Sequence, residues 1–198
     1  AGSAQQVRFR HCGAAQGFIS RGAETIAQDS AGFLWIGTAI GLFRFDGVHT
    51  LPWSFSNFSK EEKQLTKVVD IVIDKKDNIW LATTNALLRM DPVTRKLRVF
   101  RHFTTLNGEV VDAKFYSLAP DHQGGIYGIS ADYLFYIPAG DTTGKQIKVG
   151  DPDEENGFYR NTIDADTDGT IYLSIGKRIY RKSPAAAAFT LFREITET

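Results

Sequence analysis

Residues 29–38 read Asp29-Ser30-Ala31-Gly32-Phe33-Leu34-Trp35-Ile36-Gly37-Thr38, and the same pattern returns three times further along the chain. Each copy begins with an aspartate, and successive aspartates stand 45 to 47 residues apart, at Asp29, Asp74, Asp121 and Asp166. A self-similar unit of about 45 residues has the length of one four-stranded β-propeller blade. The chain is therefore predicted to be an all-β array of about four blades.

The copies agree with one another at fixed distances from the aspartate. Six residues after it stands a large aromatic ring: Trp35, Trp80, Tyr127 and Tyr172. Thirteen residues after it stands an aliphatic residue: Leu42, Leu87, Leu134 and Ile179. Three residues before it stands another: Ile26, Ile71, Leu118 and Ile163. A register kept over this distance predicts four structurally equivalent antiparallel units.

Each copy is expected to hold three strands joined by tight turns and a fourth strand after a variable link. In the first copy the strands are expected at 25–28, 33–38, 42–46 and 50–55, with a turn at Asp29 to Gly32, where glycine admits positive φ. The other outermost strands are expected at 98–103, 146–149 and 189–194. The blades are expected at 24–56, 68–104, 115–150 and 160–196, and residues 7–11 as an N-terminal outer strand.

The second strand indicates how the sheets pack. Leu34, Trp35 and Ile36 are apolar in succession, whereas a strand with one wet face would alternate. Both faces of each sheet are therefore expected to be covered, as they are when blades stack. The aromatic series is expected to lie between neighbouring blades, with each ring losing roughly 150–250 Å² of accessible surface.

Charge and composition narrow the functional classes. The chain has 23 basic and 23 acidic residues and a pI near 7.1, so no bulk field attracts nucleic acid. No stretch reaches the roughly 20 apolar residues of a membrane helix, so any membrane anchor is expected outside this sequence. Cys12 is the single cysteine, which excludes an internal disulfide. Residues 1–5 fit either a signal-peptide remnant or a cloning scar.

Two segments of the first copy resemble the two-component regulator propeller repeat: Asp29 to Thr38, and Gly41-Leu42-Phe43-Arg44-Phe45-Asp46-Gly47. Residues 74–91 form a recognisable second copy, whereas the third and fourth replace tryptophan with tyrosine and lose the Gly-Thr step. The resemblance implies a periplasmic sensor propeller, joined through a transmembrane helix to a histidine kinase, hybrid kinase or diguanylate cyclase. It also implies a small-molecule ligand, carbohydrate fragments being one class, and no enzymatic activity in the propeller itself.

Four blades are fewer than the propellers of that family contain. The sequence is compatible with a piece of a larger propeller, a compact four-bladed ring, or two chains that complete one ring. An open array would expose apolar blade faces and sheet edges, which favours association. A homodimer or a higher assembly is therefore expected, or else the remainder of the propeller as partner.

A ligand site is expected on the face where the link into the first strand and the turn between the second and third strands converge. These links contain Arg21, Lys67, Tyr116 and Arg160, and the turns contain Thr84, Asn85, Asp132 and Tyr133. The candidate ligand-binding residues are Arg21, Lys67, Asn85, Tyr116, Asp132 and Arg160. Ordinary loop surface is the competing interpretation.

One segment resembles half of a calcium loop. Asp164, Asp166 and Asp168 alternate before Gly169, which is the spacing in which carboxylates present oxygens to one Ca²⁺. The twelfth position is Ile175 instead of glutamate, and Asp166 also fits the turn of the fourth copy. Calcium is the one cofactor to consider, and a plain turn is the alternative.

Two other functional classes remain open. A lyase or glycosidase propeller would need clustered histidines or paired carboxylates near the axis. The four histidines, His11, His49, His102 and His122, are scattered in the sequence. A protein-binding scaffold propeller is the third possibility.

Overall fold

The structure is a computed structural model that describes residues 13–53, 67–84, 86–94, 96–112, 114–130, 133–149 and 161–195. Within these residues it contains eighteen strands and one short 3-10 helix, η1 (Ala14–Gln16). In this described part of the chain, no helix has the length and apolar character needed to cross a membrane. The predicted N-terminal strand at 7–11 lies outside the described residues.

The strands form four sheets, one for each sequence copy. The first sheet holds β1 (Thr25–Gln28), β2 (Leu34–Thr38), β3 (Gly41–Phe45) and β4 (Thr50–Pro52). The second holds β5 (Val68–Ile73), β6 (Ile79–Thr83), β7 (Leu87–Met90) and β8 (Leu97–Phe100). The third is built on β11 (Ser117–Pro120), β12 (Ile126–Ile129), β13 (Leu134–Ile137) and β14 (Gly144–Gln146). The fourth holds β15 (Ile163–Ala165), β16 (Ile171–Ile175), β17 (Arg178–Lys182) and β18 (Thr190–Glu194).

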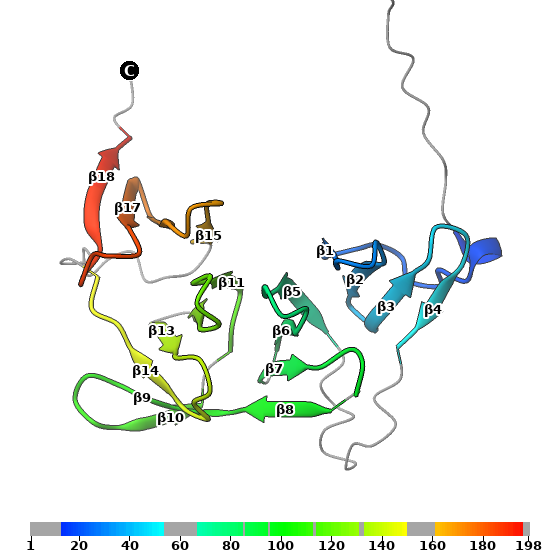
Figure 1. Cartoon of the computed structure of the whole chain (residues 1–198), viewed down its shortest axis with the longest axis horizontal. Coiled ribbons are helices and arrows are strands. Elements are labelled where there is room, and N and C mark those ends of the chain that lie inside the picture. The colour runs from blue at the N-terminus through cyan, green and yellow to red at the C-terminus, as the bar shows by residue number, and fades with distance from the viewer. Residues whose placement is uncertain are drawn as a thin grey trace, which may run out of the picture.

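The four sheets fan out as blades from their first strands. In each blade these four strands pair antiparallel in sequence order. The first strands are neighbours in space, because β1 contacts β5, β5 contacts β11, and β11 contacts β15. Figure 1 shows them on the inside of an arc that is open between β15 and β1. The prediction of an all-β propeller architecture with about four blades is confirmed, and the described blades do not close into a ring.

The third blade departs from the prediction, because a hairpin of β9 (His102–Thr104) and β10 (Val110–Asp112) extends its sheet to six strands. The outermost strand expected at 98–103 is present as β8 but ends at Phe100, and residues 102–104 form β9, which pairs in parallel with β14 of the next blade. The outer strand expected at 146–149 is β14, which lies earlier in the sequence than expected and ends at Gln146. Gly144 permits the new pairing, because a Cβ there would lie 2.5 Å from the Phe103 ring.

The core is divided into three clusters, each lying between two adjacent blades. One cluster packs Trp35 of the first blade on Ile71 and Leu81 of the second. The next packs Trp80 on the third blade, and the last packs Tyr127 on the fourth. These three rings are almost fully buried, at 0%, 2% and 4% exposed, as expected for rings between blades.

The prediction that Tyr172 is also buried between two blades was wrong for the described residues. It is only half-buried, because no described blade lies on its side of the fourth sheet. Its ring instead meets Phe192 of its own blade, with 5.8 Å between the ring centroids, and Phe192 is 48% exposed.

In three blades the residue fifteen positions after the repeat aspartate is an arginine that lies over an aromatic ring of the same blade. This feature was not predicted from the sequence. The guanidinium carbon of Arg44 lies 5.3 Å from the Trp53 ring centroid, that of Arg89 lies 5.4 Å from Trp80, and that of Arg181 lies 4.9 Å from Phe192. Cations at these distances are attracted to the ring face. In the third blade the equivalent residue is Tyr136, whose ring lies 4.5 Å from that of Tyr127.

Asp70 joins three blades near the axis. Its carboxylate accepts hydrogen bonds from the Thr25 hydroxyl at 3.3 Å and from the Leu118 backbone N–H at 2.8 Å. Burial raises the pKa of Asp70 above its ordinary value, although the backbone hydrogen bonds act in the opposite direction. The ionised carboxylate is therefore held at some cost in stability.

Asp70→Asn is expected to be at least as stable as the wild type at pH 7, because the amide oxygen still accepts from Leu118 and carries no charge. A raised folded-state pKa means that the wild type gains stability as the pH falls through that pKa, since the folded state then binds more protons. The advantage of the variant should shrink over the same range. Urea unfolding of both proteins at several pH values measures this difference, and a less stable variant at pH 7 would contradict it.

Candidate functional site

A hydrogen bond between the repeat aspartate and the ring closes the turn end of the first two blades. Asp29 Oδ2 accepts from Trp35 Nε1 at 2.8 Å, and Asp74 Oδ2 accepts from Trp80 Nε1 at 3.1 Å. This hydrogen bond links the turn between the first and second strands to the ring that packs against the next blade.

The third blade builds this end differently. Tyr127 has no indole N–H, and Asp121 Oδ2 instead accepts from the hydroxyl of Tyr136 on β13. Asp121 Oδ1 accepts from the backbone N–H groups of Gln123 at 2.7 Å and Gly125 at 2.8 Å. A Cβ on Gly125 would lie 2.5 Å from Asp121 Oδ2, so glycine is required for this arrangement.

The altered packing accompanies a cleft of about 270 Å³ between the third and fourth blades. This volume is near the lower limit of roughly 300 Å³ for small-molecule sites. The cleft has a polar side and an apolar side, with the lining residues Asp121, Gln123, Tyr127, Tyr136, Ile147, Gly169, Ile171, Lys182, Pro184 and Ala187. Sequence reasoning did not find it, because its residues are ordinary turn and core positions of two different copies.

The electrostatics of the cleft leave its phenols neutral and provide one cation. Burial, together with the nearby Asp121 charge, raises the pKa of Tyr127 to about 12. Burial and the hydrogen bond to Asp121 also raise the pKa of Tyr136. Both hydroxyls therefore keep their protons at pH 7. Among the lining residues Lys182 alone carries a positive charge, with three N–H donors.

His122 lies beside the cleft, in the turn that follows Asp121. Its Cβ lies 3.6 Å from the place that a Cβ on Gly169 would occupy, and Gly169 lines the cleft. The Nδ1 atom of His122 is buried, and among the described residues it has no hydrogen-bond partner. His122 is not among the residues that line the cleft.

The described members of the predicted ligand site, Arg21, Lys67 and Tyr116, lie at the opposite end of the blades, where the first strands begin. Arg21 is exposed, and Lys67 Nζ pairs with Glu24 Oε1 at 3.3 Å across the first two blades. Tyr116 is 39% exposed. Asn85, Asp132 and Arg160 lie outside the described residues. The structure therefore joins Lys67 to a neighbouring blade and places none of the described candidates at the cleft.

The two other turn residues named from the sequence, Thr84 and Tyr133, lie within the described residues. Thr84 follows β6. Tyr133 is partly buried, and its ring packs on that of Phe135 with 5.5 Å between centroids. Tyr133 therefore contributes to the core between the second and third blades.

The three aspartates of the calcium interpretation do not form one group. The Asp164 carboxylate accepts from the Ala165 N–H, Asp166 from Thr167, and Asp168 from the Thr170 N–H. That last hydrogen bond is the main reason that the pKa of Asp168 is lowered. In the part of the chain that the structure describes, no three His, Cys, Asp or Glu residues are arranged to hold a metal ion.

Comparison with known proteins gives structural relatives only. No protein-family model matches the chain, and no curated protein matches it in sequence. The extracellular domain of BT4673 from Bacteroides thetaiotaomicron, provisionally named a hybrid two component system, is similar with a TM-score of 0.59 and 19% identity. The match covers 85% of this chain and 24% of that one, so this chain spans about a quarter of the length of that relative.

Two further relatives carry other functions on a similar architecture. An auxiliary nutrient binding protein from Bacteroides thetaiotaomicron has a TM-score of 0.61 at 10% identity, over 90% of this chain and 44% of that one. The gluconolactonase XC5397 from Xanthomonas campestris has a TM-score of 0.56 at 14% identity, over 85% and 61%. Identities this low show a common fold, and the chain thus shares a propeller-like architecture with extracellular sensor domains, binding proteins and enzymes.

Proposed function

We propose that this chain is a ligand-sensing propeller module on the periplasmic side of a bacterial transmembrane receptor of the two-component or diguanylate cyclase type. The repeat motif at Asp29 to Thr38 and the fold shared with the BT4673 extracellular domain support this assignment. In this proposal the chain binds its ligand without chemical change. Any kinase or cyclase activity would belong to another part of the receptor.

The observation that carries the proposal is the cleft between the third and fourth blades. It combines the Lys182 ammonium, the Asp121 carboxylate, the Gln123 amide and two neutral phenols with an aliphatic wall. Sites for small organic molecules have this mixture of an apolar surface and a few polar groups that fix orientation. The cleft also bridges two blades, so a bound molecule would hold them together.

The lining favours a small carbohydrate-like molecule with an acidic group. Hydroxyl groups can pair with Gln123 and Tyr127, and a carboxylate can pair with Lys182, while the apolar wall contacts the carbon skeleton. A hydrogen bond between charged partners contributes about 1.5–3 kcal/mol. The charge of Lys182 is therefore expected to decide affinity.

The test is isothermal titration of the full chain with neutral and uronic-acid monosaccharides and disaccharides. A uronic acid is expected to bind the wild type, and Lys182→Gln should weaken binding roughly ten-fold or more. Lys96→Gln is the matched control, because Lys96 is an exposed lysine on the second blade and does not line the cleft. Absence of binding by every sugar, or equal weakening by both variants, would contradict the proposed site.

A further inference from the structure

Every blade has two different faces, and the chain already joins them in one fixed way. The ring face carries Trp35, Trp80, Tyr127 or Tyr172, and the aliphatic face carries Ile26, Ile71, Leu118 or Ile163. The strand pairing places these residues on opposite sides of each sheet, since Ala27 is opposite Trp35 and Ile26 is opposite Ile36. At all three blade junctions a ring face packs on the aliphatic face of the next blade.

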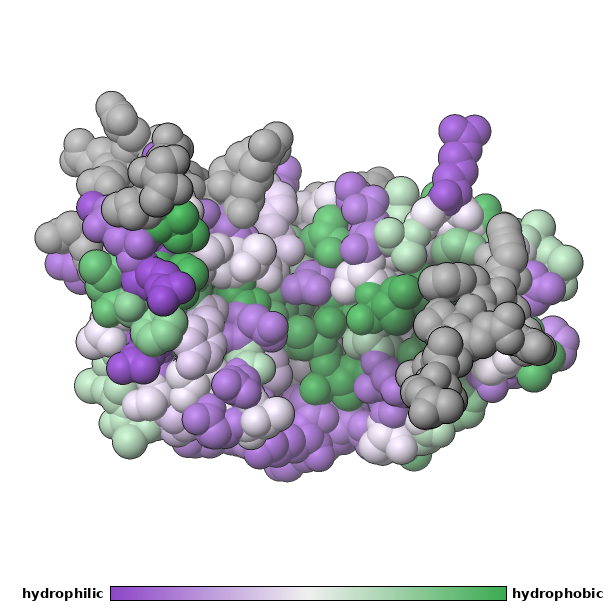
Figure 2. Space-filling view, turned by 90° about the horizontal axis from the view of Figure 1, so that it is seen from above, coloured by the Kyte–Doolittle hydropathy of each residue, from purple (hydrophilic) through white to green (hydrophobic). Residues whose placement is uncertain are grey.

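The aliphatic face of the first blade has no blade on it among the described residues. Ile26 is 58% exposed, whereas the residues at the same repeat position, Ile71, Leu118 and Ile163, are 4%, 2% and 3% exposed. Leu34 and Ile36 on the same face are half-buried, and their equivalents Ile171 and Leu173 are buried. In Figure 2, seen from the open side of the arc, apolar side chains gather in the middle of the view.

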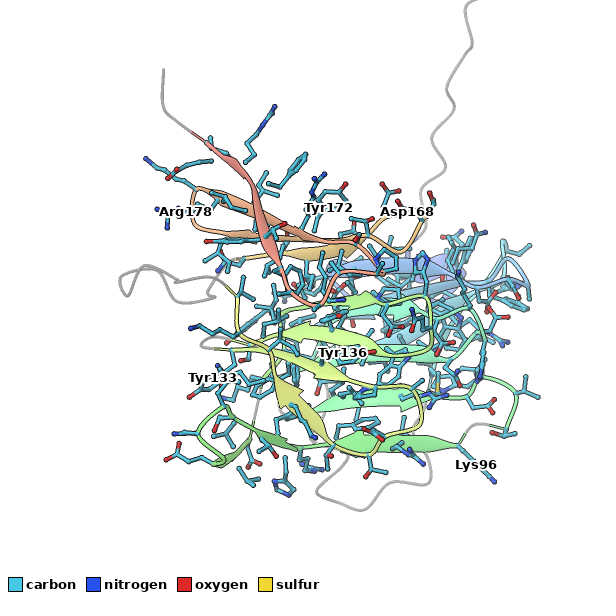
Figure 3. All side chains as sticks on the ribbon, turned by 60° about the vertical axis from the view of Figure 1, so that its left-hand side comes forward. Lys96, Tyr133, Tyr136, Asp168, Tyr172 and Arg178 are labelled. Carbon is cyan, nitrogen blue, oxygen red and sulfur yellow. The ribbon has the colours of Figure 1, made fainter. Side chains whose placement is uncertain are left out.

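The ring face of the fourth blade is uncovered in the complementary way. Tyr172, Phe192 and Arg181 correspond to Trp80, Phe100 and Arg89 of the second blade, where both rings are buried. Phe192 is 48% exposed, whereas Phe100 is 2% exposed. A hollow of about 400 Å³ on this face is lined in part by Tyr172 and Arg181. Figure 3 shows Tyr172 on the outer side of the fourth sheet, away from the other blades.

Two polar contacts near the axis likewise join one blade to the next, with the acceptor on the earlier blade and the N–H donor on the later one. Asp70 accepts the Leu118 N–H of the next blade at 2.8 Å, and Ser117 Oγ accepts the Ile163 N–H of the blade after that at 3.2 Å. Both acceptors stand four residues before the repeat aspartate. In the fourth blade the residue at the acceptor position is Thr162. In the first blade the residue at the donor position, equivalent to Leu118 and Ile163, is Ile26.

We propose that a second copy of this chain covers both faces, with the ring face of each fourth blade packed on the aliphatic face of the partner's first blade. A second copy fits both faces, because the two uncovered faces are the two halves of an interface that the chain forms three times internally. Tyr172 and Phe192 then contact the Ile26 region, and the Thr162 hydroxyl lies near the Ile26 N–H.

This contact is heterologous, since two different faces meet. Two four-bladed arcs related by a two-fold rotation make the contact twice and close a ring, whereas any other rotation gives larger or open assemblies. Closure also removes the exposed apolar faces that would otherwise favour uncontrolled association. The inference is independent of the ligand cleft, which lies within a single chain.

Light scattering after size-exclusion chromatography tests the assembly with the chain as it is. The wild type is expected at twice its mass of 22.0 kDa. Ile26→Asp and Phe192→Arg should each give 22.0 kDa, because each places a charge in both contacts of the ring. Both side chains are about half exposed in the single chain, so circular dichroism should show an intact fold. Val93→Asp is the matched control at an 88% exposed site and should leave the wild-type mass unchanged.

Mixing the two variants distinguishes a heterologous contact from a symmetric one. A pair made of one Ile26→Asp chain and one Phe192→Arg chain keeps one contact without substitutions, and its other contact joins aspartate to arginine. The mixture is therefore expected to recover the doubled mass. A wild type that stays at 22.0 kDa, variants that keep the doubled mass, or a mixture that stays monomeric would each overturn the proposal.

Discussion

Trp80→Ala is expected to lower the free energy of unfolding by about 3–5 kcal/mol, the usual cost of removing a buried tryptophan. Trp80 is 2% exposed and lies between the second and third blades, where its ring stacks on Phe100 with 5.5 Å between centroids. Its Nε1 donates to Asp74 at 3.1 Å, so the substitution also removes a buried hydrogen bond. The resulting cavity would lie in the junction that joins one half of the arc to the other.

Guanidinium unfolding followed by circular dichroism measures the loss. Trp80→Phe keeps most of the ring but loses the hydrogen bond, and about 1–2 kcal/mol is expected for it. Val93→Ala, at an 88% exposed turn position, should stay within about 0.5 kcal/mol of the wild type. If Trp80→Ala fell in the same range as Val93→Ala, the two blades would not depend on this ring.

The repeat could be predicted from the sequence because its recurring positions have the same local structural role in every copy. The position three residues after the aspartate has a positive φ in all four turns: 90° at Gly32, 59° at Asp77, 100° at Gly124 and 86° at Gly169. Glycine adopts this conformation without steric cost, and aspartate tolerates it better than most residues. The turn, and with it the register of the two strands it joins, therefore recurs wherever the motif recurs.

Features that depend on contacts between copies could not be predicted in this way. The β9–β10 hairpin lies in the link between the second and third blades, and its pairing with β14 requires Gly144, which lies opposite Phe103. Tyr172 has the same repeat position as Trp80, but its burial is decided by whether another blade covers it. Its sequence environment alone therefore predicted more burial than the described residues provide.

The cleft illustrates the same limit. Replacement of tryptophan by Tyr127 is visible in the sequence, but the partner that Asp121 takes in its place comes from another strand. Lys182, the one cation of the lining, belongs to the next copy altogether. The sequence indicated a ligand site at the loops near Lys67, because propeller geometry gives a general expectation and no particular residues.

Asp74→Ala is expected to destabilise the chain by about 2–4 kcal/mol, since it leaves several buried donors without an acceptor. The Asp74 side chain accepts from the Lys76 and Asn78 backbone N–H groups at 2.9 and 3.0 Å. It also accepts from Asn78 Nδ2 and Trp80 Nε1. Asn78 is 8% exposed and Trp80 is 2% exposed, so water cannot easily replace the lost oxygens.

Asp166→Ala is the matched control, because Asp166 opens the fourth copy as Asp74 opens the second. The Asp166 carboxylate is exposed and accepts from its neighbour Thr167, so its removal should cost about 0.5 kcal/mol or less. Urea unfolding of the two variants in parallel therefore compares one repeat position in two surroundings. Equal losses would mean that the turn itself carries the energy, and a large difference would assign it to the buried junction that the aspartate shares with the ring.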